Sequence, residues 1–175
     1  MIHINASRAS LMSHISMTES LIADHSIFLA APLNVKVARQ AFPLAKLFNP
    51  DLDLADWSAY VRSLASRPAQ TAGLQMVQDQ RGYVHALFAY SISRDLLLRR
   101  ILRVSDLVIC LLPGMTLIGT LAETFYDIAL KYGCTEIIVE LGYSNPARTI
   151  LQSAGFNPMS IEGLLVKQIK NGHAN

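Results

Sequence analysis

The spacing of apolar residues is helical in the first part of the chain. From Leu33 onwards apolar side chains recur every three or four residues, which predicts a helix that ends at Asn49. Pro43 is expected to kink or break this helix, because proline lacks the N–H that a helical hydrogen bond needs. Asp53 is a favourable N-cap and predicts the start of a second helix, which ends before Pro68.

The period then changes to that of strands. Residues 73–77 and 83–92 flank a polar turn, Asp79-Gln80-Arg81-Gly82, and predict an antiparallel hairpin. The strand predicted over 101–112 is apolar and β-branched enough to be covered on both faces. Between these strands lies the arginine-rich segment 94–100, which we interpret as a solvated link, with contact to a ligand phosphate or an acidic substrate as the alternative.

The C-terminal half alternates strands with helices, which is typical of a mixed α/β domain. Gly133 is the expected C′ residue of the longer helix, and Asn145 is the expected N-cap of the shorter one. The elements expected after the central strand are a helix over 118–132, a strand over 136–141, a short helix over 146–154 and two strands around 156–161 and 164–169.

Composition supports one globular domain over residues 33–175. Residues 1–32 show no sustained period, and we interpret them as a partly ordered N-terminal lead-in. Of the 175 residues, 51% are hydrophobic and 16% are charged, which excludes disorder as the dominant state. The formal net charge is only +2 and there is no dense basic tract, so we expect no nucleic-acid partner.

Cysteine usage and hydropathy bear on the compartment. Cys110 and Cys134 are too few and too far apart for a disulfide scaffold or a cysteine zinc site, so we expect a cytoplasmic protein without a metal. The apolar run 27–35 contains Pro32 and Asn34 and is too short to cross a bilayer. We therefore expect no membrane span.

The loop before the longer helix is a candidate anion-binding site. A strand that ends in Pro-Gly and leads into a helix places unpaired N–H groups at the positive end of the helix dipole, which suits a phosphate. Gly114 and Gly119 have the spacing of a P-loop, but Thr120 and Leu121 replace its lysine and hydroxyl residue, which disfavours nucleotide hydrolysis. Two interpretations remain, a pyrophosphate held by main chain alone and a tight turn without a ligand.

This part of the chain resembles the GNAT superfamily of acyl-CoA-dependent N-acyltransferases. The most specific segments are Ile118-Gly119-Thr120-Leu121 with the helix that follows, and Ser144-Asn145-Pro146-Ala147-Arg148 with the later Ala154-Gly155-Phe156. The resemblance covers about residues 33–169 and implies a mixed, mostly antiparallel central sheet flanked by helices and splayed at the cofactor site. It also implies acetyl-CoA or another acyl-CoA as the cofactor. The cofactor-binding residues that it implies are Leu111, Leu112, Gly114, Met115, Thr116, Leu117, Ile118, Gly119, Thr120, Asn145 and Arg148.

The chain departs from the family pattern in two places. If Gly119 is the last glycine of the family loop, Leu117 replaces the earlier glycine and Gly114 replaces the basic residue. The tyrosine that commonly protonates the leaving thiolate falls on Leu151, which cannot donate a proton. The resemblance therefore implies an N-acyltransferase with another proton donor, with a catalytically inactive acyl-CoA-binding or protein-interaction module as the alternative.

Three residues are candidates for catalysis. Transfer from a thioester requires a neutral amine and protonation of the thiolate. Asp106 is the first candidate base, because it aligns loosely with an acidic residue that some family members carry at the start of this strand, with a turn or edge residue as its structural alternative. Glu140 is the second, with an ion pair to Arg148 or Lys131 as its structural alternative. Tyr143 is the candidate proton donor, with the capping of a buried phenol as its structural alternative.

The acceptor is an amine whose carrier the sequence does not identify. The resemblance places the acceptor surface near Phe42, Trp57, Tyr60 and the segment 94–100, which contain no diagnostic motif. A small molecule and a protein both remain open as acceptors, as does an acyl chain longer than acetyl. The sequence also leaves open whether the chain forms a homodimer.

Overall fold

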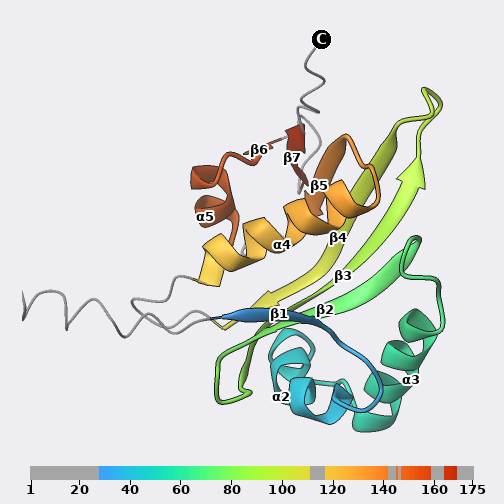
Figure 1. The fold of residues 1–175 in the computed structure, drawn as a ribbon. Helices are drawn as coiled ribbons and strands as arrows, with labels where there is room; N and C mark the ends of the chain where they lie inside the picture. Colours follow the sequence, from blue (N-terminus) through green and yellow to red (C-terminus); the bar gives the residue numbers. More distant parts are fainter. Residues whose placement is uncertain (1–27, 111–116, 142–144, 146, 159–163, 169–175) are drawn as a thin grey trace, which may run out of the picture.

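The computed structural model describes residues 28–110, 117–141, 145, 147–158 and 164–168 (Figure 1). Within these ranges seven strands form one sheet in the order β1-β2-β3-β4-β5-β7-β6, and only the β4–β5 pair is parallel. The expectation of a mixed, mostly antiparallel sheet is therefore confirmed. The strands are β1 (Leu29–Pro32), β2 (Ala72–Gln78), β3 (Val84–Arg94), β4 (Arg100–Ile109), β5 (Glu136–Glu140), β6 (Asn157–Pro158) and β7 (Leu164–Gln168); the helices are α2 (Ala38–Phe48), α3 (Leu54–Ala65), α4 (Leu117–Lys131) and α5 (Ala147–Ser153).

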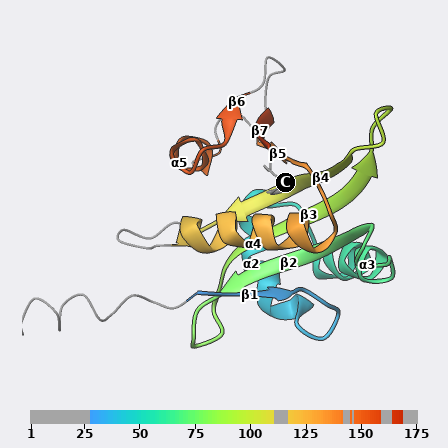
Figure 2. The same cartoon turned by 45° about the horizontal axis from the view of Figure 1, so that its top comes forward.

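The helices cover the two faces of the sheet separately. Helices α2 and α3 lie on one face and α4 and α5 on the other, as Figures 1 and 2 both show. The larger hydrophobic core lies beneath α4 and α5 and includes Phe88 and Phe125, whose rings meet edge to face at 4.8 Å between centroids. The smaller core lies beneath α2 and α3 and includes Trp57, Leu74 and Leu87. No helix in the described ranges is long and apolar enough to cross a bilayer.

Helix α2 continues through its proline. The expected interruption at Pro43 does not end the helix, which runs from Ala38 to Phe48. Proline removes one helical hydrogen bond and its ring crowds the carbonyl four residues earlier, while Ala38, Ala41 and Leu44 on the buried face pack into the smaller core on both sides of it. Packing of this face therefore outweighs the local penalty.

Other local predictions are confirmed. The Asp53 carboxylate accepts a hydrogen bond from the N–H of Asp56 at 2.7 Å and caps α3. Gly82 in the β2–β3 turn and Gly133 after α4 both adopt positive φ, at 85° and 66°. These are conformations in which glycine avoids the steric cost that a side chain incurs.

Two segments differ from the expectation. Residues 94–100 are not a link, because Arg94 and Arg100 pair across a β3–β4 hairpin whose tip is Asp95 to Arg99. At the N-terminal edge, β1 pairs with β2 through Leu29–Pro32, so the sheet begins inside the segment expected as a lead-in. At the opposite edge, β6 has only two residues in the described part of the chain.

Candidate functional site

The sheet opens between β4 and β5. The parallel pairing of these strands runs from Ile101 to Val104 on β4, whereas β4 continues alongside β3 as far as Ile109. Because the N–H of Cys110 donates to the carbonyl of His85 on β3, the N–H of Ile109 points in the opposite in-plane direction, towards the β5 side. The expected splay is thus present, and it exposes a strand edge to the gap.

A β-bulge lies in β4 at the start of this opening. The register shifts by one residue between Leu87 and Ala89, so Asp106 and Leu107 both lie opposite Phe88. Asp106 adopts φ 51°, a left-handed conformation that aspartate tolerates better than most residues. A bulge bends its strand and redirects a side chain.

The bulge decides where the Asp106 carboxylate lies. Leu102 and Val104 both belong to the larger core, and regular alternation would send Asp106 to the same face. The extra residue instead places Leu107 in the larger core and Asp106 on the opposite face, among residues that line a pocket next to α2 and α3. The bulge therefore keeps the Asp106 carboxylate out of the larger hydrophobic core.

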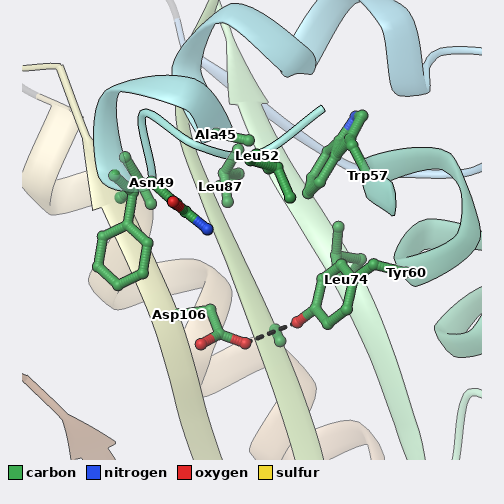
Figure 3. Close-up of a pocket in the computed structure, with 11 residues that line it drawn as sticks. Ala45, Asn49, Leu52, Trp57, Tyr60, Leu74, Leu87 and Asp106 are labelled. Atoms are coloured by element: carbon green, nitrogen blue, oxygen red, sulfur yellow. Dashed lines mark hydrogen bonds between the residues drawn. The ribbon is translucent and has the colours of Figure 1, made fainter. Parts of the chain in front are cut away.

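This pocket has a volume of about 220 Å³ and is mostly apolar (Figure 3). Its lining comes from α2, α3, the segment between them and strands β2 to β4. Asp106 carries the only carboxylate among the described lining residues, and Asn49 and Tyr60 are the other polar ones. Such a combination of apolar walls and few polar groups is typical of a small-molecule site.

Tyr60 donates a hydrogen bond to Oδ2 of Asp106 at 2.6 Å (Figure 3). Its ring stacks on Trp57 with centroids 5.9 Å apart, and the Trp57 indole N–H donates to the carbonyl of Ala38 at 2.7 Å. These contacts fix the phenol relative to both helices. Burial, and then the bond and charge of Asp106, raise the pKa of Tyr60, so the phenol stays protonated and keeps donating this hydrogen bond at neutral pH. Within the described residues Oδ1 of Asp106 has no hydrogen-bond partner.

Glu140 and Asp106 are not brought together in one pocket. The Glu140 carboxylate lies at the end of β5 and pairs with Arg103 at 3.5 Å, with both side chains about half exposed. The expected partners Arg148 and Lys131 are therefore wrong, and the pair is a weak surface one. Tyr143 lies outside the described residues.

The cofactor-binding candidates divide into described and undescribed residues. Leu117, Ile118, Gly119 and Thr120 form the first turn of α4, where backbone N–H groups have no helical partner. The Leu117 side chain is fully buried in the larger core, so only its main chain is available to a ligand. Gly119 is exposed, and no atom of the described residues lies within 4 Å of where a Cβ would be, apart from its own helix backbone and chain neighbours. The remaining candidates in this loop, Leu111, Leu112, Gly114, Met115 and Thr116, lie outside the described residues.

Asn145 bridges the open end of the sheet. Its Oδ1 accepts from the N–H of Ala147 at 3.0 Å, which confirms the predicted cap of α5. Its Nδ2 donates to the carbonyl of Leu107 in the β4 bulge, also at 3.0 Å. Arg148 donates to the carbonyl of Leu141 at 3.3 Å, beyond the end of β5. The two side chains connect α5 to both strands that border the gap.

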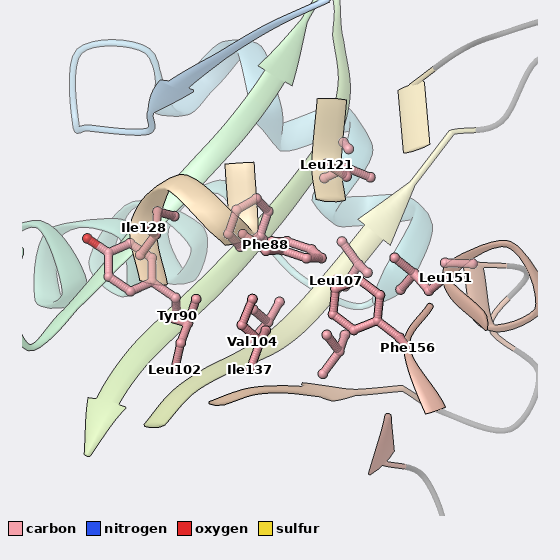
Figure 4. Close-up of a cluster of buried hydrophobic side chains, with 14 of the residues drawn as sticks. Phe88, Tyr90, Leu102, Val104, Leu107, Leu121, Ile128, Ile137, Leu151 and Phe156 are labelled. Carbon is pink, nitrogen blue, oxygen red and sulfur yellow. The ribbon is translucent and has the colours of Figure 1, made fainter. Parts of the chain in front are cut away.

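Leu151 is part of the larger core. Its side chain is fully buried together with Leu107 and Phe156, and the three lie close together in Figure 4. Leu151 thus contributes packing and no proton donor.

Sequence reasoning did not predict the Tyr60–Asp106 pair. It assigned Tyr60 to the acceptor surface and Asp106 to the reacting centre. The two residues are 46 positions apart in the sequence, and no contact between them was expected. The helical spacing of Trp57 and Tyr60 was visible in the sequence. The bulge that turns Asp106 towards them was not, because no glycine or proline marks it.

Comparisons with known proteins identify the fold. No family model matches the sequence, and no curated protein matches it. Solved structures do match: glucosamine-6-phosphate N-acetyltransferase from Arabidopsis thaliana aligns with a TM-score of 0.64 and 15% identity over 78% of this chain and 95% of that chain. AAC(6')-Iy, in complex with the bisubstrate analogue CoA-S-monomethyl-acetylneamine, gives 0.63 and 14% over 78% and 95%. An acetyltransferase of the GNAT family from Streptococcus pneumoniae gives 0.57 and 16% over 82% and 100%. The resemblance is confirmed at the level of the fold, which is that of GNAT acetyltransferases.

Proposed function

We propose that this protein is an acyl-CoA-dependent N-acyltransferase that transfers an acetyl group to a primary amine. The observation that carries the proposal is the Tyr60–Asp106 pair, held in an apolar pocket beside the point where β4 leaves β5. The fold supports it, because the structures that share it include N-acetyltransferases and one complex with a CoA conjugate.

The residues around the gap fit an acyl-CoA, which supplies an activated thioester. The N–H of Ile109 faces the gap and suits the thioester carbonyl, whose developing negative charge a fixed backbone donor stabilises. The first turn of α4 offers N–H groups to the pyrophosphate, with open space at Gly119 for close approach. The Asn145 bridge to Leu107 keeps α5 at this opening.

Asp106 is the proposed base. Its Oδ1 can bind the ammonium of the acceptor and accept one proton, which passes to water and leaves a neutral amine. The amine nitrogen then attacks the thioester carbonyl, the carboxylate accepts the second proton as the N–C bond forms, and the C–S bond breaks to release the thiolate, which takes up a proton. Tyr60 holds the other carboxylate oxygen and orients the group. For the thiolate, Leu151 offers no proton, and Tyr143 is our candidate donor.

The pocket also suggests the class of amine. A cavity of about 220 Å³ with apolar walls accommodates a short alkyl or aryl group, and the single carboxylate attracts a cation and repels anions. We therefore propose a primary amine on a compact apolar group as the acceptor, and we expect phosphorylated or carboxylated amines to be poor substrates.

An amine panel with acetyl-CoA tests this function. Free thiol release would be followed with phenethylamine, butylamine, glucosamine 6-phosphate and glutamate at equal concentration. We expect turnover with the first two and little with the acidic amines. Turnover confined to the acidic amines would refute the acceptor class, and no turnover with any amine would refute the enzyme.

A second candidate is a binding module without catalysis. The observation that favours it is the full burial of Leu151 at the position where the family commonly has a catalytic tyrosine. Such a module would bind acetyl-CoA saturably in calorimetry but would release no thiol with any amine. The same two measurements therefore separate the candidates.

A further inference from the structure

The β3–β4 hairpin ends in an exposed run of three leucines. Leu96 is fully exposed, and Leu97 and Leu98 each keep 73% of their surface exposed. Figures 1 and 2 both show the hairpin reaching beyond the body of the domain, away from α4 and α5. Scattered surface leucines are ordinary, but a contiguous apolar patch indicates an interaction site.

The tip is an organised turn, and Asp95 holds it together. The Asp95 carboxylate accepts hydrogen bonds from the N–H groups of Leu97 and Arg99, both at 2.9 Å. The N–H of Leu98 donates to the Asp95 carbonyl at 3.0 Å. The Arg99 guanidinium pairs with the same carboxylate at 2.7 Å and compensates its charge. Because these polar groups already have partners, transfer of the tip out of water costs less.

Two arginines lie immediately behind the leucine tip. Arg94 and Arg100 pair across the hairpin and line a polar cavity of about 340 Å³ together with Thr71 and Ser93. No carboxylate in the described part of the chain forms an ion pair with either guanidinium. The hairpin therefore presents an apolar end followed by positive charge, with a polar recess large enough for a phosphate group.

We infer that the hairpin tip, Leu96 to Leu98, docks on an anionic lipid surface, with Arg94 and Arg100 at the level of the lipid phosphates. The charge pattern supports this occupant, because leucines favour the acyl boundary and arginines favour anionic headgroups. The exposure of all three leucines supports it too, because a lipid layer can surround a projecting turn on every side. This inference does not depend on the proposed function.

Vesicle cosedimentation of the full chain tests the leucines. The probes are phosphatidylcholine vesicles with and without 30% phosphatidylglycerol. The double substitution Leu97→Ser with Leu98→Gly removes two leucines and relieves the left-handed backbone of Leu98, whose φ is 60°. We expect partition into anionic vesicles to fall at least about tenfold. Leu130→Ser, at a leucine 59% exposed on α4, is the matched control and should bind like the wild type.

The arginines provide the second arm. Arg94→Gln with Arg100→Gln should lower binding to anionic vesicles by about fivefold per charge, and added salt should abolish that difference. Failure of the wild type to bind anionic vesicles would overturn the inference, as would equal loss in Leu130→Ser. Association of the chain with itself that the leucine substitutions abolish, measured by light scattering without lipid, would assign the tip to a second copy instead.

Discussion

Replacement of Asp106 by asparagine removes the proposed base and leaves the shape of the site almost unchanged. Asparagine can still accept the hydrogen bond from Tyr60, but it cannot take a proton from the amine. General base catalysis contributes about 10²- to 10⁴-fold in rate. We therefore expect kcat/KM to fall by this factor, which corresponds to about 2.7 to 5.5 kcal/mol of transition-state stabilisation.

Loss of folding cannot produce a fall of this size. Asp106 is exposed, and asparagine tolerates its left-handed φ of 51° as well as aspartate does. The change turns a hydrogen bond to a charged acceptor into one to a neutral acceptor, a difference of about 1 kcal/mol in unfolding free energy. Urea unfolding should therefore show a modest change, and calorimetry should show unchanged coenzyme A affinity.

The assay is thiol release with phenethylamine at saturating acetyl-CoA from pH 6 to 9. Glu140→Gln, at the other acidic candidate, should keep activity near the wild-type value, because Glu140 pairs with Arg103 and does not line the pocket. Activity of Asp106→Asn within about threefold of the wild type would refute the assignment of the base. A large loss in Glu140→Gln alone would transfer that role to Glu140.

Three further predictions concern stability and the cofactor. The pKa of Tyr60 is higher in the folded chain than its ordinary value of 10. The protonated phenol therefore contributes its full stabilisation below pH 10, and this contribution is lost as pH rises from 10 towards the folded-state pKa. Between pH 10 and 11 the unfolding free energy of the wild type should thus fall by up to about 1 kcal/mol more than that of Tyr60→Phe, and by less where solvent screens the partly exposed phenol. Equal losses for the two proteins in urea titrations would contradict this. Gly119→Ala should raise the unfolding free energy by about 0.5 to 1 kcal/mol. Gly119→Leu should still fold, but its side chain should weaken the binding of coenzyme A. Unchanged coenzyme A affinity of Gly119→Leu in calorimetry would place the cofactor elsewhere. Asn145→Asp keeps the cap of α5 but loses the donor to Leu107, so it should be destabilised by about 1 to 3 kcal/mol in urea, and wild-type stability would show that the bridge contributes nothing.

Local signals in the sequence predicted local structure well. Asp53 and Asn145 were recognisable as caps because each side chain bonds a backbone N–H two or three residues away. Gly82 in the β2–β3 turn and Gly133 after α4 were recognisable because both positions need a left-handed conformation. The helix of α4 followed from apolar side chains three and four residues apart.

Features that depend on distant partners were not predictable in this way. The bulge at Asp106 arises from the register between β3 and β4, and its benefit lies in contact with Tyr60 on a helix far away in sequence. The continuity of α2 through Pro43 depends on packing of its buried face. The partner of Glu140 is Arg103 on the neighbouring strand, which strand order alone determines.

Titration of the wild-type chain with acetyl-CoA in a calorimeter tests the central claim most directly. The opening between β4 and β5, with the first turn of α4 and the Asn145 bridge, should give saturable binding of one acetyl-CoA per chain. The absence of saturable heat at millimolar acetyl-CoA would contradict both the acyltransferase and the binding-module proposals.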